Sequence, residues 1–160
     1  MKKIFFGILL MCFTANIFAQ ARDAGEYTNS CECMGVEADG SETILAWGNG
    51  RNRFDAVEQA KKNAVLDVLF NGIRKGRGAC SIKPLVPEVN ARTKYDVYFN
   101  SFFADGGEYL EFVSLQDERV GDKIDRDRQK GRKSINMSAV VRVERGLLKA
   151  KLIKDNILKQ

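Results

Sequence analysis

Apolar and polar residues follow a clear order between residues 43 and 76, and this stretch gives the firmest structural prediction in the chain. Residues 43–47 are mainly apolar, and Gly48 and Gly50 follow them. From residue 54 to residue 73, apolar side chains recur at intervals of three and four, with charged side chains largely on the other side. The pattern predicts a strand, a tight turn at the two glycines and an amphipathic helix.

Both ends of the predicted helix carry residues that suit helix ends. Asn52 is a suitable N-cap, and Asp55 lies near the positive end of the helix dipole. Asn71 and Gly72 mark the other end, because such residues tolerate the left-handed conformation of a C-cap. The inward stripe begins with three small side chains, which let the helix lie close to a sheet. These are Ala56, Ala60 and Ala64.

This strand and helix resemble the amino-terminal domain of flagellar assembly protein T and the related small envelope lipoproteins. The resemblance covers residues 40–115, and it is carried by residues 46–50 together with Ala56, Ala60, Ala64 and Leu69. It implies an α+β domain that works in the bacterial envelope by binding rather than by catalysis. The resemblance assigns no functional residues to this chain, because the motif positions are structural in character.

A strand that runs into Gly48-Asn49-Gly50 and then a helix also invites comparison with phosphate-binding loops. The dinucleotide-binding fingerprint needs a third glycine three residues after the second, and this chain has Arg53 there. A P-loop needs Gly-Lys-Ser or Gly-Lys-Thr, which the sequence lacks. We therefore expect the glycines to serve the turn and not a nucleotide.

Four more elements are predicted after a connector at residues 82–87 that holds both prolines. Aromatic residues at helical spacing predict a helix over residues 92–104, whose aromatic stripe is expected to be core. Alternating apolar and polar residues predict strands over residues 108–115 and 134–144, paired antiparallel. An amphipathic pattern predicts a closing helix over residues 147–158.

These elements predict a single α+β domain over residues 42–160. We expect an antiparallel sheet of three or four strands, with two or three helices packed mainly on one face, because one-sided burial is typical of antiparallel sheets. Residues 22–41 are mostly polar, and they are expected to form an extended arm or edge strand that leads into the domain.

The first 21 residues have the features of a secretory signal peptide. Two lysines precede an apolar run, and Ala19-Gln20-Ala21 fits the small-residue rule for cleavage. We expect cleavage after Ala19 or Ala21, so that the mature chain begins at Gln20 or Arg22 in the periplasm or outside the cell. Lipidation of Cys12 is disfavoured, because a methionine precedes it where a small residue is expected.

Three cysteines follow the predicted cleavage site, and an oxidising compartment favours a disulfide among them. Cys31 and Cys33 lie two apart in the arm, where their side chains point the same way and pair poorly with each other. Cys80 is therefore expected to pair with Cys31 or with Cys33, which leaves one free thiol. A zinc site is not expected, because the chain has no histidine, and no other cofactor is expected either.

The charge of the chain limits its partners. The full chain has a net charge of +5, and removal of its two signal-peptide lysines leaves 24 basic and 21 acidic residues, a net charge of +3. Nucleic acid is not an expected partner of an exported protein with so small a basic excess.

Residues 117–133 are mostly charged, and they are expected to form a solvated hairpin tip. As a functional site they would be a basic finger for an anionic partner such as a lipid headgroup or an acidic glycan. Interleaved aspartates would cancel about half of the attraction, so contact with a membrane surface would be weak. The basic residues concerned are Lys123, Arg126, Arg128, Lys130, Arg132 and Lys133.

The sequence favours an exported, non-enzymatic envelope protein that acts as a protein-binding, surface-binding or assembly module. Its expected partner is an envelope protein or a cell-surface component. The absence of histidine removes the commonest general base and metal ligand. The alternative is an exported hydrolase that acts on an envelope glycan through a pair of carboxylates. The candidate carboxylates are Glu108, Glu111, Asp117 and Glu118.

Overall fold

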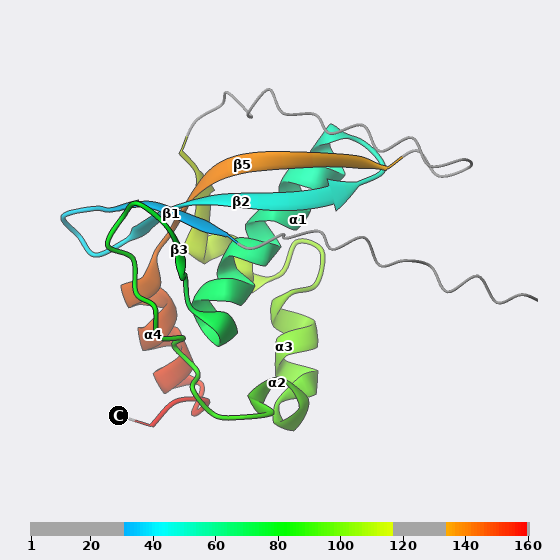
Figure 1. Ribbon diagram of the computed structural model, residues 1–160. Coiled ribbons are helices and arrows are strands. Elements are labelled where there is room, and N and C mark those ends of the chain that lie inside the picture. Colours follow the sequence, from blue (N-terminus) through cyan, green and yellow to red (C-terminus); the bar gives the residue numbers. More distant parts are fainter. Residues whose placement is uncertain (1–30, 117–133, 160) are drawn as a thin grey trace, which may run out of the picture.

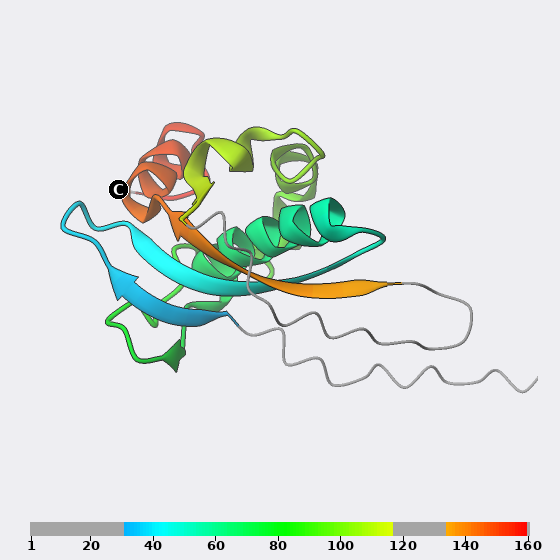
Figure 2. The same cartoon turned by 90° about the horizontal axis from the view of Figure 1, so that it is seen from above.

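A five-stranded sheet forms one layer of the structure, and helices cover one of its faces (Figures 1 and 2). The computed structural model describes residues 31–116 and 134–159. The strand order is β3-β1-β2-β5-β4, and every neighbouring pair is antiparallel except β1 and β3. The strands are β1 (Glu32–Val36), β2 (Glu42–Gly50), β3 (Lys75–Gly76), β4 (Val113–Leu115) and β5 (Ile135–Val143).

Helix α1 packs along β2 and β5, and α3 and α4 lie on the same side of the sheet (Figures 1 and 2). Asn52 caps α1 as expected, because its Oδ1 accepts a hydrogen bond of 2.9 Å from the Asp55 backbone N–H. The helical elements are α1 (Arg53–Leu66), the π-helical turn η1 (Asp67–Asn71), α2 (Ala91–Lys94), α3 (Asp96–Phe102), the 3-10 turn η2 (Glu108–Phe112) and α4 (Arg145–Lys154). None of these helices is long and apolar enough to cross a membrane.

The α+β class is confirmed, but the predicted number of three or four strands is wrong. Residues 32–36 of the predicted arm form β1, which pairs with β2 on one side and β3 on the other. Strand β3 is only two residues long, and both residues are exposed, so no apolar alternation marks it in the sequence. The predicted pairing of the last two strands is confirmed, with Val113 of β4 opposite Val143 of β5.

Gly48 and Gly50 belong to strand β2, so the prediction that they form a tight turn is wrong. Their role is to let α1 approach the sheet. A Cβ atom on Gly48 would lie 2.0 Å from the carbonyl oxygen of Ala56 and 2.4 Å from the backbone nitrogen of Ala60. A Cβ atom on Gly50 would lie 2.4 Å from the Ala56 nitrogen. The small helix stripe and the two strand glycines together make one close backbone contact.

The strand predicted over residues 108–115 is also corrected, because only its last three residues are a strand. Tyr109 and Phe112 are both buried. They are three residues apart, a spacing that a 3-10 turn places on one side. Their rings join the aromatic residues of α3, with the Phe102 and Phe112 ring centroids 6.0 Å apart. Aromatic packing therefore overrides the alternation that suggested a strand.

Substitution of Gly48 by alanine tests the close contact. The new methyl group would overlap the α1 backbone, which cannot move without moving the helix, so we expect a loss of at least about 2 kcal/mol in the free energy of unfolding. Gly146 in α4 is the control, because a Cβ atom there meets nothing within 4 Å. Gly146→Ala should leave stability unchanged or raise it by up to about 1 kcal/mol. Urea denaturation measures both, and equal effects of the two variants would contradict the packing described.

Candidate functional site

The segment between η1 and the proline-containing connector carries a group of exposed basic side chains. We call residues 73–83 the basic loop. The chain has no acidic residue between Asp67 and Glu88. None of the exposed basic side chains of this loop forms an ion pair with a residue that the structure describes. They are Arg74, Lys75, Arg77 and Lys83.

Backbone hydrogen bonds close the basic loop at its base and join it to the sheet. The Ile73 N–H donates to the Ser81 carbonyl oxygen over 3.1 Å, which brings the two ends of the loop together. Strand β3, inside the loop, pairs with β1, and the Gly78 N–H donates to the Cys33 carbonyl oxygen over 3.3 Å. Gly76 has a φ of 111°, and a Cβ atom there would lie 2.2 Å from the same carbonyl oxygen.

A disulfide between Cys33 and Cys80 fixes the basic loop to β1, with the two Cα atoms 5.8 Å apart. This is one of the two pairings that the sequence left open. Cys31 keeps a free thiol that is almost fully buried. Burial, with a smaller effect of the Asp67 carboxylate, raises the pKa of this thiol well above its usual range. Cys31 is therefore protonated and a poor nucleophile.

An ion pair between the buried Glu42 and Arg145 holds the backbone of the second half of the basic loop. Glu42, at the start of β2, is 2% exposed, and its Oε1 accepts a hydrogen bond of 2.7 Å from the Ser81 N–H. Its Oε2 lies 3.8 Å from a guanidinium nitrogen of Arg145. The other terminal nitrogen of Arg145 donates to the Lys83 carbonyl oxygen over 2.7 Å. The pair thus fixes the backbone on both sides of residue 82.

The sequence did not identify this support. One signal was present, because the inward positions of β2 include Ile44 and Ala46, and Glu42 continues that series two residues earlier. A carboxylate at an inward strand position needs a partner, since burial of an unpaired charge is strongly unfavourable. The partner, Arg145, lies about a hundred residues along the chain at the start of α4, and local pattern does not indicate it.

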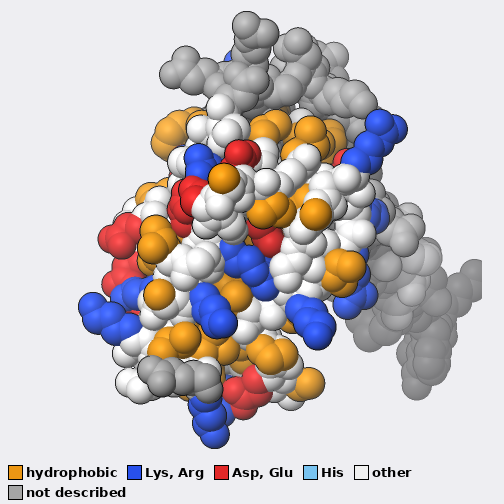
Figure 3. All heavy atoms as spheres, turned by 90° about the vertical axis from the view of Figure 1, so that its left-hand side faces the viewer, with side chains coloured by type: hydrophobic (Ala, Val, Ile, Leu, Met, Phe, Trp, Pro, Cys, Tyr) orange, Lys and Arg blue, Asp and Glu red, His pale blue; other side chains and the backbone are white. Residues whose placement is uncertain are grey.

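Figure 3 looks onto the side of the molecule where the loop after β3 and helix α4 lie. Lys and Arg side chains are spread over this face, with hydrophobic side chains and several Asp and Glu side chains between them. Ile82 of the basic loop is 64% exposed, and Leu147 in the first turn of α4 is 60% exposed. The face thus presents basic and acidic side chains together with exposed apolar ones.

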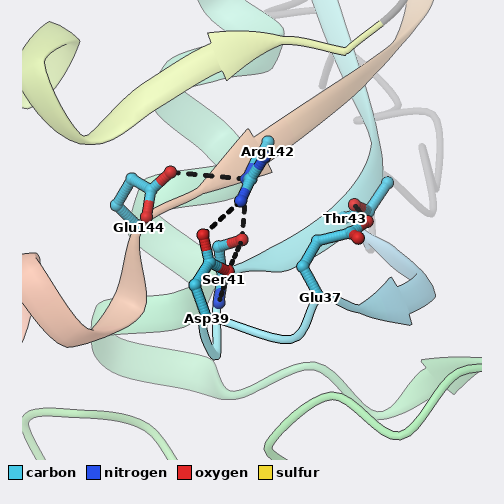
Figure 4. A network of polar contacts seen from close by, with 6 residues as sticks. All are labelled: Glu37, Asp39, Ser41, Thr43, Arg142 and Glu144. Atoms are coloured by element: carbon cyan, nitrogen blue, oxygen red, sulfur yellow. Dashed lines mark hydrogen bonds and ion pairs between the residues drawn. The ribbon is translucent and has the colours of Figure 1, made fainter.

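A second polar network lies at the turn between β1 and β2 (Figure 4). Arg142 of β5 donates to Ser41 Oγ over 2.7 Å, pairs with Asp39, and lies 3.4 Å from Glu144. Hydrogen bonds from Ser41, with a further effect of Arg142, lower the pKa of Asp39. The one guanidinium of this network faces two carboxylates, so the network holds the turn against β5 and offers no excess positive charge to an anionic partner.

The carboxylates of the hydrolase alternative are in different surroundings. Glu108 lies in a hollow of about 380 Å³ between α3, η2 and α4, where its carboxylate is 2.8 Å from Lys151 Nζ. Lys151 also pairs with Asp155 over 3.0 Å, and Tyr98 donates to Asp155 over 2.6 Å. The bond from Tyr98, followed by that from Lys151, lowers the pKa of Asp155.

The remaining candidates of that alternative are not part of this hollow. Glu111 is exposed. Asp117 and Glu118 lie outside the described residues, as do all six basic residues of the predicted finger, from Lys123 to Lys133. In the two described ranges, no group of three Cys, Asp or Glu side chains is arranged to hold a metal ion.

Comparison with known proteins gives no relative for this chain. No family model, no curated protein sequence and no solved structure matches it. The resemblance to flagellar assembly protein T therefore stays a prediction.

Removal of the disulfide tests how much this bond contributes to the stability of the fold. Its two cysteines are 47 residues apart, and cross-linking a chain segment of that length stabilises by about 4 kcal/mol through the entropy of the unfolded chain. We expect a loss of up to about 4 kcal/mol in the free energy of unfolding for Cys33→Ser/Cys80→Ser. Cys31→Ala, which removes only the free thiol, should lose about 1 kcal/mol. Equal losses would show that the pairing is wrong, and peptide mapping without reduction checks it independently.

Proposed function

We propose that this chain is an exported, non-enzymatic protein that binds an anionic component of the cell envelope through its basic loop. The observation that carries the proposal is the loop itself. It has four exposed basic side chains, no acidic residue, and a backbone held by a disulfide and a buried ion pair. A positive charge on a rigid, folded scaffold favours recognition, because little conformational entropy is lost on binding.

Export is supported by two independent features. The first residues of the chain fit a signal peptide with cleavage before Gln20 or Arg22. A buried disulfide that joins a strand of the sheet to the basic loop is typical of proteins that fold in an oxidising compartment. Together they favour the periplasm or the cell exterior, where the membrane surface and many glycans are anionic.

Binding is favoured over catalysis by the state of the acidic groups. A general acid at neutral pH needs a raised carboxyl pKa, whereas hydrogen bonds lower the pKa values of Asp39, Asp105 and Asp155. Glu108, the hydrolase candidate that lies in the hollow between α3, η2 and α4, is paired with Lys151. These groups are suited to holding elements together.

The test compares two doubly substituted proteins that lose the same charge. Lys75→Ser/Arg77→Ser removes two charges from the basic loop. Arg53→Ser/Arg92→Ser removes two exposed charges from α1 and α2, neither of which is ion-paired with a described residue. The protein recovered after export is mixed with envelope particles from the same cells and sedimented at about 0.1 M and about 1 M salt, where the Debye length falls from about 10 Å to about 3 Å.

We expect the unmodified protein and the α1/α2 variant to sediment with the particles at low salt and to be released at high salt. The basic-loop variant should stay largely in the supernatant at both. Equal sedimentation of the two variants would contradict the role of the loop. A failure of the unmodified protein to sediment at low salt would contradict the proposed function as a whole.

A further inference from the structure

Ile82 stands out in the basic loop because it is a large apolar side chain held in solvent. Its backbone cannot turn to bury it, since both neighbours are fixed. Ser81 is bonded to Glu42, and the Lys83 carbonyl oxygen accepts a hydrogen bond from Arg145. The side chain of Ile82 is 64% exposed as a result. Ile82 lies within a group of basic side chains, which suits a partner that is both anionic and apolar.

The surroundings of Ile82 are basic. Lys83 is the next residue, and the hydrogen bond between Ile73 and Ser81 places Arg74 beside the same end of the loop. Lys75 and Arg77 follow at the edge of the sheet that the structure describes, where β3 pairs with β1. The acidic residue opposite Lys75 is Glu32 of β1, so the four basic side chains of the loop and this carboxylate together carry a net charge of +3.

We propose that the basic loop docks on the surface of a membrane that contains anionic phospholipids, with Ile82 entering the interface between headgroups and acyl chains. This rests on the proposed function and names its partner. A group of basic side chains with an exposed apolar side chain among them fits such an interface, which is negatively charged outside and apolar beneath. Charge alone would suffice for an acidic glycan and would leave Ile82 unexplained. A protein partner typically covers about 800 Å² on each side, with an apolar centre larger than one side chain.

The basic residues and Ile82 should contribute to membrane binding in different ways. A basic residue near an anionic leaflet strengthens partitioning roughly fivefold, so loss of two should weaken it on the order of thirtyfold. Partial insertion of one isoleucine side chain should contribute roughly tenfold. Binding should therefore need both kinds of residue, and only the charged part should depend strongly on salt.

The experiment measures sedimentation of the protein recovered after export with vesicles of phosphatidylcholine alone, and with vesicles of an equimolar mixture of phosphatidylcholine and phosphatidylglycerol. Soluble dextran sulfate is the polyanion without an apolar layer. Lys75→Ser/Arg77→Ser is compared with Arg53→Ser/Arg92→Ser. Ile82→Ser is compared with Val97→Ser, which removes another exposed apolar side chain, 79% exposed on α3. Circular dichroism checks that all variants are folded.

We expect binding to the phosphatidylglycerol vesicles alone, a loss on the order of thirtyfold for the basic-loop variant, and a loss of roughly tenfold for Ile82→Ser. Both control variants should stay within about twofold of the unmodified protein. An Ile82→Trp variant should shift its fluorescence to shorter wavelength on binding these vesicles. Trp47 is the only other tryptophan, and the unmodified protein supplies its background.

Three outcomes would overturn the inference and differ in what they leave. Binding to dextran sulfate without binding to the vesicles would mean that the partner is a soluble or glycan polyanion. No loss for Ile82→Ser would mean that the loop binds through charge alone. Either result would leave the proposed function intact. No binding to vesicles, to dextran sulfate or to envelope particles would overturn both proposals.

Discussion

Helix α1 lies so close to β2 that its backbone occupies the space where side chains at Gly48 and Gly50 would be. The small stripe on the helix and the glycines on the strand make this contact possible, and it fixes the direction of α1 across β2 and β5. Because the contact fixes the direction of α1, it also fixes the position of the helix's carboxyl-terminal end. The other elements then attach to the surface that the helix and the sheet create.

The end of α1 leads directly into the basic loop. The last turn widens to a π-helical turn in which the Gly72 N–H donates to the Asp67 carbonyl oxygen over 2.7 Å. The Asp67 side chain accepts a hydrogen bond of 3.2 Å from the Cys31 N–H, so the turn is joined to the start of β1. The loop that follows is then tied by the disulfide and by Glu42. The positively charged loop is thereby held by three contacts: the Asp67 hydrogen bond, the disulfide and the Glu42 hydrogen bond. Each contact joins residues from distant parts of the chain.

The sequence predicted the elements whose signals are local. Asn52 as a helix cap and the alternation of β5 are both visible in short stretches. The need of Cys80 for a partner in the arm follows from the number and spacing of the cysteines. Strand β3 was missed because its two exposed residues form a strand only through hydrogen bonds to β1. Gly48 was assigned to a turn, since glycine before a helix has the same sequence appearance whether it reverses the chain or admits a close neighbour.

The basic loop was missed as a site for a related reason. Its charges are too few to stand out in the sequence beside the charged residues 117–133. What distinguishes the loop is its support by Cys33, Glu42 and Arg145, which come from distant parts of the chain. Long-range pairings of this kind are set by the tertiary fold and are not encoded in any local pattern.

Amide hydrogen exchange tests most directly whether the basic loop is a fixed surface. In the oxidised protein, the amides of Ile73, Gly78 and Ser81 should exchange slowly, because each donates a hydrogen bond inside the loop or to the sheet. Reduction of the disulfide should speed exchange at these three positions and leave the paired amides of β2 and β5 protected. Rapid exchange of the three loop amides in the oxidised protein, at the rate of free chain, would contradict the account.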